Sequence, residues 1–275
     1  MRYLKIFVIL FFLLSLGLCA WTVQTYLQST NADIPVLSCE IPELTVSVKD
    51  PPEALLAGLT AYDETDGDLT DQIMVASTTH FISLGTVRVK YVVFDKHNNS
   101  ATYTRSVHYS DYQSPRFSLS QAPIYLRGDN FDILNHITVI DDLDGNISHK
   151  VKVISSAVSN YTAGSYPVML EVANSYGDTS QIELRVIYLD KYSSQVTIRL
   201  RNYIAYVEAG SKFDPYSYIL SVTDGTGVAL SKDSVTVDGN VNTAQPGSYQ
   251  LTYSYDSEGL LGQSSMTVVV LDREG

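Results

Sequence analysis

Aspartates cluster in two loops of this chain, and clustered carboxylates are what a hard cation such as Ca²⁺ requires. Each cluster surrounds a glycine, which allows a tight turn. Ca²⁺ takes about six to eight oxygen ligands, so carboxylates a few residues apart can supply part of a site. The candidate calcium ligands are Asp63, Asp66 and Asp68 in the first loop and Asp141, Asp142 and Asp144 in the second.

The same aspartates have a second interpretation, in which they build turns and bind no metal. Asp and Asn side chains next to glycine accept hydrogen bonds from their own backbone. Exposed carboxylates also repel one another little in water and salt. Counted from Asp63, the twelfth position is Met74, where an EF-hand carries a bidentate glutamate. The first loop is therefore not an EF-hand, and both interpretations stay open.

Catalytic chemistry finds little support in the sequence. The five histidines show no spacing of a helical metal pair, and no nucleophile elbow, phosphate loop or metalloprotease motif is present. A net charge of −12 argues against nucleic acid, whose binding requires a basic face. We therefore predict a non-enzymatic protein without a nucleic-acid partner. The 20 tyrosines allow a glycan-binding aromatic face as an alternative, although packing in strands explains most of them.

Three repeats carry and position the loops. In each repeat a glycine opens a run in which alternate residues are apolar, and this period of two indicates a strand with one buried face. A polar turn and a second alternating run follow, which is the signal of a β-hairpin. The runs begin at Gly85, Gly164 and Gly247, and the turns lie at 95–99, 174–178 and 256–259.

An acidic loop precedes the hairpin in every repeat and weakens along the chain. The first copy is 66–70 (Asp-Gly-Asp-Leu-Thr), the second is 144–148 (Asp-Gly-Asn-Ile-Ser), and the third, 223–227, keeps one aspartate. Several short strands per repeat with frequent turn signals predict an antiparallel β-sandwich. The repeat length corresponds to one small domain each and exceeds that of a solenoid unit.

Together the two signals resemble the immunoglobulin-like repeats of bacterial surface proteins. The family pattern is Asp…Asp-Gly-Asp-(Ile/Leu)-Thr, followed by a hairpin that ends in Asp-x-x-Gly-Asn. The first repeat matches it at Asp63, 66–70, Gly85, Tyr91, Asp95 and Asn99, and His97-Asn98 stands where the family often has glycine. The second repeat keeps less and the third least. The resemblance covers about residues 36–272 and implies the fold more than the function, because such domains serve as spacers, adhesins and enzyme appendages.

The N-terminus carries a hydrophobic segment. Residues 6–21 are almost entirely apolar, Arg2 and Lys5 precede them, and no acidic residue occurs before Asp33. This arrangement orients the N-terminus toward the cytoplasm. With residues 22 and 23 the run is about 18 residues long, close to the length that spans a bilayer. We predict an uncleaved signal anchor, with a cleaved signal peptide as the alternative.

We therefore predict an all-β chain of three tandem immunoglobulin-like β-sandwich domains after one N-terminal transmembrane helix. The first strand is expected at Leu44, Val46 and Val48, and 266–271 is expected to pair within the third domain or to offer an exposed edge. The predicted layout is a cytoplasmic N-terminus at 1–5, a membrane segment at 6–23, a stalk at 24–35, and domains at 36–110, 115–190 and 195–272 with short linkers between them.

The predicted function is that of a membrane-anchored extracytoplasmic array at a bacterial cell surface. It would act as a spacer, an adhesion module or a protein–protein interaction module, held in the membrane through 6–23 and contacting an unknown protein or glycan. The alternatives are a calcium- or glycan-binding surface protein, with Ca²⁺ as the one possible cofactor, and an accessory subunit of an envelope complex. A cleaved N-terminal segment would make the protein secreted.

Overall fold

A computed structural model describes residues 2–29, 34–190 and 195–272. Helix α1 (Arg2–Ser29) contains one window, Ile6–Thr25, that is long and apolar enough to cross a membrane, and none of that window is buried. Twenty helical residues extend about 30 Å, the thickness of a bilayer's hydrocarbon core. The helix continues through the first part of the predicted stalk, and residues 30–33 of that stalk lie outside the described residues.

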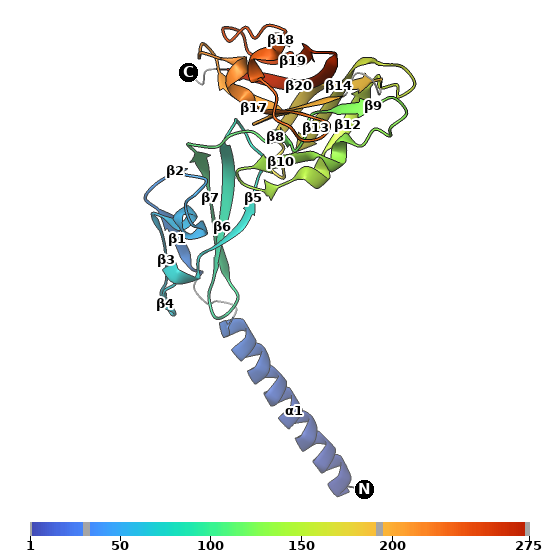
Figure 1. The fold of residues 1–275 in the computed structure, drawn as a ribbon. Coiled ribbons are helices and arrows are strands. Elements are labelled where there is room, and N and C mark those ends of the chain that lie inside the picture. The colour runs from blue at the N-terminus through green and yellow to red at the C-terminus, as the bar shows by residue number, and fades with distance from the viewer. Residues whose placement is uncertain (1, 30–33, 191–194, 273–275) are drawn as a thin grey trace. The chain divides into compact units, whose positions relative to one another are not determined.

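Each of the three repeats folds into two β-sheets, one short and one of four strands (Figure 1). The four-stranded sheet always contains the predicted hairpin, and most of its inward-facing residues are buried. Val87, Val89, Tyr91 and Val93, for example, all have 0% exposure. The prediction of all-β immunoglobulin-like sandwiches after one apolar helix is confirmed.

Domain one has sheets in the orders β1-β3-β4 and β2-β7-β6-β5. Hairpin β6–β7 pairs Thr86 with His108 at one end and Phe94 with Ser100 at the other. The elements are β1 (Val36–Cys39), β2 (Glu43–Val46), the 3₁₀ helix η1 (Pro52–Leu56), β3 (Leu59–Asp63), β4 (Gly67–Asp68), η2 (Thr70–Gln72), β5 (Met74–Thr78), β6 (Thr86–Phe94) and β7 (Ser100–Tyr109).

Domain two repeats this plan in the orders β11-β10-β8 and β12-β13-β14-β9. The inward side chains of its hairpin, Val168, Leu170 and Val172, are at most 1% exposed. The elements are β8 (Arg116–Leu119), β9 (Ile124–Leu126), η3 (Ile133–Asn135), β10 (Ile137–Asp141), β11 (Gly145–Asn146), η4 (Ser148–Lys150), β12 (Lys152–Ser156), β13 (Gly164–Ala173) and β14 (Thr179–Leu189).

Domain three has a two-stranded sheet, β15-β17, and a four-stranded sheet in the order β16-β20-β19-β18. Its last strand, β20, lies between β16 and β19, so in-sheet pairing of 266–271 is confirmed. The elements are β15 (Val196–Leu200), β16 (Ile204–Glu208), η6 (Pro215–Tyr218), β17 (Ile219–Asp224), η7 (Lys232–Ser234), β18 (Val235–Asp238), β19 (Gly247–Ser257) and β20 (Leu260–Leu271).

Two features of the strand pairing differ from the prediction. The first strand of domain one is β1, which pairs with β3, whereas Leu44 and Val46 lie in the second strand and Val48 lies beyond its end. Each four-stranded sheet also contains one parallel pair, formed by β2 with β7, β9 with β14, and β16 with β20. The parallel partner comes from the start of each domain and joins the strand that ends it.

The end of domain one also differs from the predicted linker at 110–115. Asp111 accepts hydrogen bonds from Ser47 Oγ at 2.7 Å and from the backbone N–H of Val48 at 2.8 Å. Tyr112 is buried with 5% exposure. Both residues therefore pack on domain one, and the first half of the predicted linker is part of that domain. The second predicted linker, 190–194, lies outside the described residues except for its first position.

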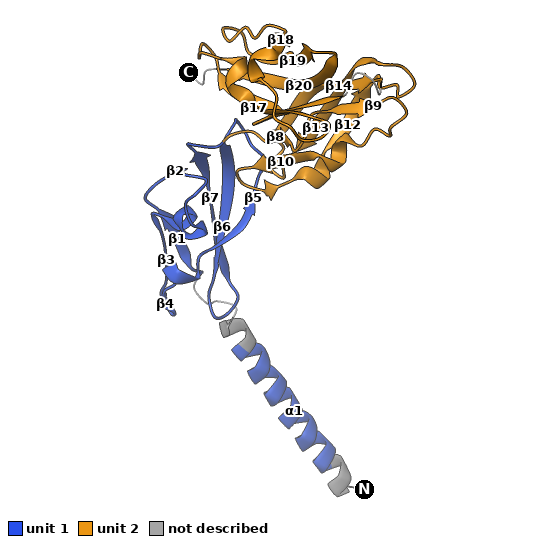
Figure 2. Ribbon diagram, in the orientation of Figure 1, with its two compact units in different colours: residues 1–112 blue, residues 113–275 orange. Residues whose placement is uncertain are grey.

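The chain divides into two compact units, residues 1–112 and residues 113–275 (Figure 2). Domains two and three share the second unit because β16 serves both of them. Ile204 belongs to the core of domain two and Tyr206 packs against it, while Ala205 belongs to the core of domain three. Alternate side chains of one strand thus point into two neighbouring cores.

Polar contacts complete this junction within the second unit. The backbone N–H of Phe117 donates to Tyr206 Oη at 2.8 Å, and the Arg116 guanidinium lies 5.2 Å from the centre of the Tyr206 ring. Gln250 Nε2 donates to the carbonyl of Glu183 at 3.0 Å. Burial raises the pKa of Tyr206 further above its ordinary value, so the ring adds no charge to this junction. Domains two and three are consequently joined by a shared apolar core with bonded polar groups.

Candidate functional site

The acidic loop of domain one is built by backbone hydrogen bonds to its own aspartates. Asp63 ends β3 with 2% exposure, and its Oδ1 accepts from the backbone N–H groups of Thr65 and Asp66, both at 2.9 Å. Gly67 has φ +80°, a conformation that L side chains rarely adopt. Asp68 Oδ1 accepts from the N–H of Thr70 at 2.9 Å. The loop is therefore folded by Asx-turn hydrogen bonds.

Asp66 connects this loop to the other sheet of the sandwich. Its Oδ2 accepts from the backbone N–H of Lys96 in the β6–β7 turn at 2.8 Å, and its Oδ1 lies 3.0 Å from Lys96 Nζ. The backbone N–H and then the side chain of Lys96 lower the pKa of Asp66, against a smaller opposing effect of burial. One ionised carboxylate thus joins the short sheet to the long hairpin.

Domain two contains the same connection. Asp141 Oδ1 accepts from the N–H groups of Leu143 at 3.0 Å and Asp144 at 2.7 Å. Asp144 accepts from the N–H of Ser175 at 2.7 Å and from Ser175 Oγ at 2.6 Å. Lys150 Nζ lies 3.0 Å from Asp144. Burial raises the pKa of Asp144, but Ser175 and Lys150 outweigh it and lower that pKa overall.

In domains one and two the hairpin turn is held by the residue that follows the first strand of the hairpin. Asp95 Oδ1 accepts from the N–H groups of His97 at 2.8 Å and Asn99 at 2.7 Å, and its Oδ2 accepts from Asn99 Nδ2 at 2.8 Å. In domain two Asn174 Oδ1 accepts from the N–H groups of Tyr176 at 3.0 Å and Asp178 at 2.9 Å. In domains one and two the acidic loop and the hairpin turn therefore form one hydrogen-bonded cluster at the same end of the sandwich.

The predicted calcium ligands do not converge in this arrangement. Asp68 bonds Thr70, and Asp142 accepts from the N–H of Gln113 at 2.9 Å. Within residues 2–29, 34–190 and 195–272, no group of three or more His, Cys, Asp or Glu side chains is placed to hold a metal ion. In domain three Asp224 accepts from Thr226 and Val228 of its own turn. Calcium binding stays a prediction, and the described geometry adds nothing in its favour.

Arg105, which is not among the candidate residues of the sequence, lies in the core of domain one. Its side chain is 3% exposed and lies on the inward-facing side of β7. The guanidinium donates to the carbonyls of Ala57 at 2.7 Å, Leu55 at 2.8 Å and Ile41 at 2.9 Å, and Nε donates to Tyr91 Oη at 3.2 Å. Period-two alternation was the signal that could have revealed it, because position 105 falls between the inward positions 103 and 107.

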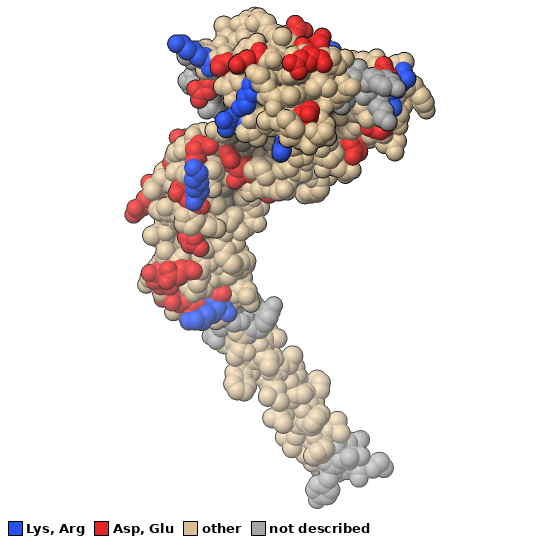
Figure 3. All heavy atoms as spheres, viewed as in Figure 1, with Lys and Arg blue, Asp and Glu red and all other residues tan. Residues whose placement is uncertain are grey.

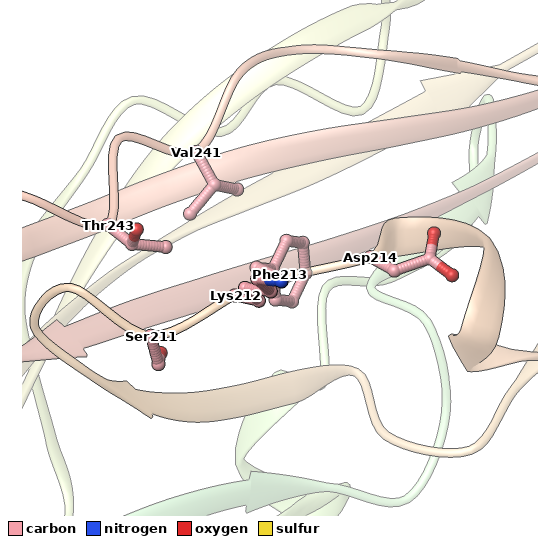
Figure 4. Close-up of a pocket in the computed structure, with 6 residues that line it drawn as sticks. All are labelled: Ser211, Lys212, Phe213, Asp214, Val241 and Thr243. Carbon is pink, nitrogen blue, oxygen red and sulfur yellow. The ribbon is translucent and has the colours of Figure 1, made fainter.

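A shallow hollow of about 580 Å³ lies on domain three (Figure 4). Two of its lining side chains hold local turns: Ser211 Oγ donates to the carbonyl of Glu208 at 2.7 Å, and Asp214 accepts from the N–H of Tyr216 at 3.0 Å. Phe213 packs against Tyr218 with ring centres 5.4 Å apart. The hollow is lined by Ser211, Lys212, Phe213, Asp214, Val241 and Thr243.

The surface is acidic and exposes few aromatic rings. Figure 3 shows carboxylate side chains gathered over domain one on the face that it displays, with few basic side chains between them. Among the side chains that the structure describes, the tyrosines with more than half of their surface exposed are Tyr62, Tyr161 and Tyr216, one in each domain. No domain therefore presents a pair of such rings as a platform for a sugar.

Comparison with protein families identifies the domain type. Residues 202–270 match the family model described as the bacterial surface protein, Ig-like domain. The third repeat is therefore similar to the Ig-like domain of bacterial surface proteins. The matched stretch is the third repeat, in which the acidic loop is weakest, and it runs from just before β16 to near the end of β20. The resemblance inferred from the first repeat is confirmed by this match to another one.

Comparison with individual proteins adds a partial relative. The chain is 27% identical over 261 residues to the pesticidal crystal protein Cry22Aa of Bacillus thuringiensis. The match covers 92% of this chain and 34% of that protein, so the chain spans about a third of its relative's length.

Among solved structures, the catalytic and carbohydrate-binding domains of Clostridium perfringens ZmpB match 88% of the chain at 16% identity and cover 31% of that structure. The TM-score is 0.26. A lipoprotein of Bacteroides thetaiotaomicron matches 85% of the chain at 13% identity, over 99% of its own length, with a TM-score of 0.21. These scores are too low to transfer any property to this chain.

Proposed function

We propose that this protein is a non-enzymatic, membrane-anchored module that presents Ig-like domains on the outer side of a bacterial cytoplasmic membrane for contact with another protein. The observation that carries the proposal is the combination, in one chain, of a fully exposed apolar window at Ile6–Thr25 and an Ig-like domain of the bacterial surface type. Exposed apolar side chains over the length of a bilayer are costly in water and favourable in lipid. The window acts as an uncleaved anchor, with the positive residues Arg2 and Lys5 on the cytoplasmic side.

The chemistry of the domains supports a structural and binding role. The carboxylates that could have served a reaction or a metal are engaged by backbone N–H groups and lysines, as Asp66 and Asp144 show. The shared core of domains two and three joins residues 113–275 into one compact unit. Such a unit suits presentation of a binding surface, whereas catalysis needs converging reactive groups.

Membrane fractionation and protease treatment of intact cells test the anchoring. We expect the wild-type chain in the membrane fraction, with its domains accessible to added protease. The double variant L13R/L14R places charges in the middle of the helix, where each arginine costs about 2.5–3.5 kcal/mol. We expect it to be lost from the membrane fraction. The control I82R/L84R adds the same charges at two exposed apolar positions of domain one and should remain in the membrane.

The outcome against anchoring is equally clear. Wild-type chain in the medium, shortened at its N-terminus, would show that the segment is a cleaved signal peptide and that the protein is secreted. To test the binding role, cross-linking on intact cells should be followed by purification of the tagged chain in detergent. A specific second protein supports the proposal. Binding to arrayed oligosaccharides without any protein cross-link would replace it with the glycan-binding alternative.

A further inference from the structure

An apolar face lies open on the short sheet of domain one. Ile34, Val36 and Tyr62 have 65%, 63% and 58% of their surfaces exposed. Val36 and Tyr62 are cross-strand partners in the β1–β3 pair, so their side chains lie side by side on one face of the sheet. Pro35 is buried, so by alternation Ile34 lies on the same outer side as Val36. Apolar side chains that are exposed as a group indicate an interaction surface.

The other two repeats show that the sandwich does not require this apolar pair. The equivalent cross-strand pairs, each one position before the aspartate that ends β3, β10 or β17, are Val36 with Tyr62, Arg116 with Ile140, and Thr197 with Thr223. Two threonines serve in domain three, and in domain two the Arg116 guanidinium lies against the Tyr206 ring. Of the three domains, only the one that follows the apolar helix pairs two apolar side chains here. The fold alone therefore does not account for them.

A short tether joins this face to the apolar helix. Helix α1 ends at Ser29, so five residue steps lead to Ile34, and they span at most about 18 Å. Ser29 lies four residues beyond Thr25, where the membrane-spanning window ends, which adds about 6 Å of helix. Ile34 is therefore held within about 24 Å of the hydrocarbon core, and the headgroup layer occupies about the first 5–8 Å of that distance.

Charged neighbours determine which lipid surface this face fits. Tyr62 lies opposite Asp68, and Glu64 is exposed two residues further along the chain. Carboxylates stay hydrated and are repelled by anionic headgroups, so the face fits zwitterionic headgroups and does not enter the hydrocarbon core. A tyrosine suits this depth, because its ring is apolar and its hydroxyl can bond water or headgroups.

We propose that Ile34, Val36 and Tyr62 contact the zwitterionic headgroup layer of the membrane that holds α1. This inference rests on the proposed anchoring, because the anchor is what brings the face within reach of lipid. Contact removes apolar surface from water. Since the tether already holds the two surfaces together, their association is effectively intramolecular, and a small apolar area is sufficient.

A second copy of the chain fits this face less well. A two-fold symmetric contact centred on Tyr62 would place the exposed Glu64 and Asp68 of both copies next to one another. Like charges that meet at an interface are unfavourable. A lipid surface without net charge brings no such repulsion.

Quenching by brominated lipid tests the contact in the full chain. Trp21 is the only tryptophan, so the variant W21F/Y62W carries a single fluorescent reporter, which lies on the face. One copy per nanodisc is reconstituted in phosphatidylcholine that is either unmodified or brominated near the headgroup. We expect brominated lipid to quench the reporter at position 62, and the quenching to persist in about 1 M salt, which screens charges but strengthens apolar contact.

Matched variants show whether the apolar face makes the contact. Adding I34T/V36T to the reporter chain should remove most of the quenching, whereas I82T/L84T, which changes two other exposed apolar residues of domain one, should leave it unchanged. The variant W21F/T104W places the reporter on an exposed position of β7, in the other sheet, and should not be quenched.

The failures of the contact and of the anchor are distinguishable. No quenching at position 62, in nanodiscs that do quench Trp21 of the wild type, would overturn the contact and leave the anchor in place. No quenching of Trp21 either would overturn the anchoring itself. Quenching that is lost in high salt would refute the apolar contact. If two copies in one nanodisc shield position 62 from acrylamide and abolish its quenching by lipid, the face belongs to a second copy.

Discussion

Replacing Arg105 by alanine should destabilise domain one more than any surface change. The substitution leaves the carbonyls of Ile41, Leu55 and Ala57 without the guanidinium that now donates to them at 2.7–2.9 Å. An unsatisfied buried polar group costs about 1–3 kcal/mol. Water entering the vacated volume keeps each loss near the lower limit, so three carbonyls give about 3 kcal/mol in total.

This loss is large relative to the stability of a small domain. Typical domains unfold with about 5–15 kcal/mol. For a domain of this size each kcal/mol corresponds to about 4–8 °C in melting temperature, so R105A should lower the domain-one transition by at least about 12 °C. Calorimetry of the full chain in detergent measures that shift directly. The transition of residues 113–275 should remain where it is, because it belongs to a separate compact unit.

Two further variants separate the geometry of the guanidinium from its charge. R105K keeps the positive charge, but an ammonium on a flexible chain cannot reproduce the planar fork that reaches three carbonyls, so we expect an intermediate loss. R88A removes an exposed arginine from the neighbouring strand β6 and should change stability by less than about 0.5 kcal/mol. Wild-type stability of R105A, or full rescue by R105K, would refute the role assigned to the fork.

Three further outcomes are expected. Millimolar Ca²⁺ should leave the melting of the full chain as it is in EDTA, because the acidic loops bond backbone N–H groups; a rise of several degrees would establish the calcium alternative. Asp144 has a lowered pKa, so the stability it contributes is lost as pH falls below about 4, and D144N should show less of this acid loss in calorimetric melts. G262A should destabilise domain three by about 1–3 kcal/mol or more, since the new Cβ would lie 2.2 Å from the carbonyl oxygen of Val196. G225A, whose Cβ would meet its nearest atom at 3.8 Å, is the matched control and should melt like the wild type.

The hairpins could be predicted because their signal is local. A buried face shows itself as alternation within a single strand, and Gly85 at φ +71° marks the point where the chain turns into β6. The three hairpins β6–β7, β13–β14 and β19–β20 accordingly lie where the alternating runs were found. The same reasoning applies to the acidic loops as turns, since an aspartate before a glycine needs only its own neighbours to fold.

Contacts between distant segments could not be predicted in this way. The hydrogen bond from Lys96 to Asp66 spans 30 residues, and Arg105 reaches carbonyls 48 to 64 residues away. No periodicity within one strand records such pairs. The parallel pairing of β2 with β7 depends likewise on how the two ends of the domain meet. Arg105 lies at an inward position of β7, but the alternation that predicts a strand is one of apolar residues, so a charged residue at such a position gives no signal.

The loss of the acidic loop in domain three becomes understandable once the loop is seen as a connection between sheets. Domains one and two make that connection with a carboxylate, from Asp66 to the turn of one hairpin and from Asp144 to the turn of the other. In domain three the backbone makes it directly, because the N–H of Gln195 donates to the carbonyl of Leu261 at 2.7 Å.

Gly262 permits this direct connection, since a side chain there would collide with Val196 at the start of β15. Val196 also pairs with Asp224, the residue that ends β17 where the acidic loop begins. The two sheets therefore meet beside the same loop and hairpin turn in all three domains. Because the backbone already joins the two sheets, no aspartate side chain is needed between them. Among the contacts described, the side chain of Asp224 bonds only within its own turn. The acidic motif is therefore weakest in the third repeat because a backbone hydrogen bond there replaces the carboxylate that joins the two sheets in domains one and two.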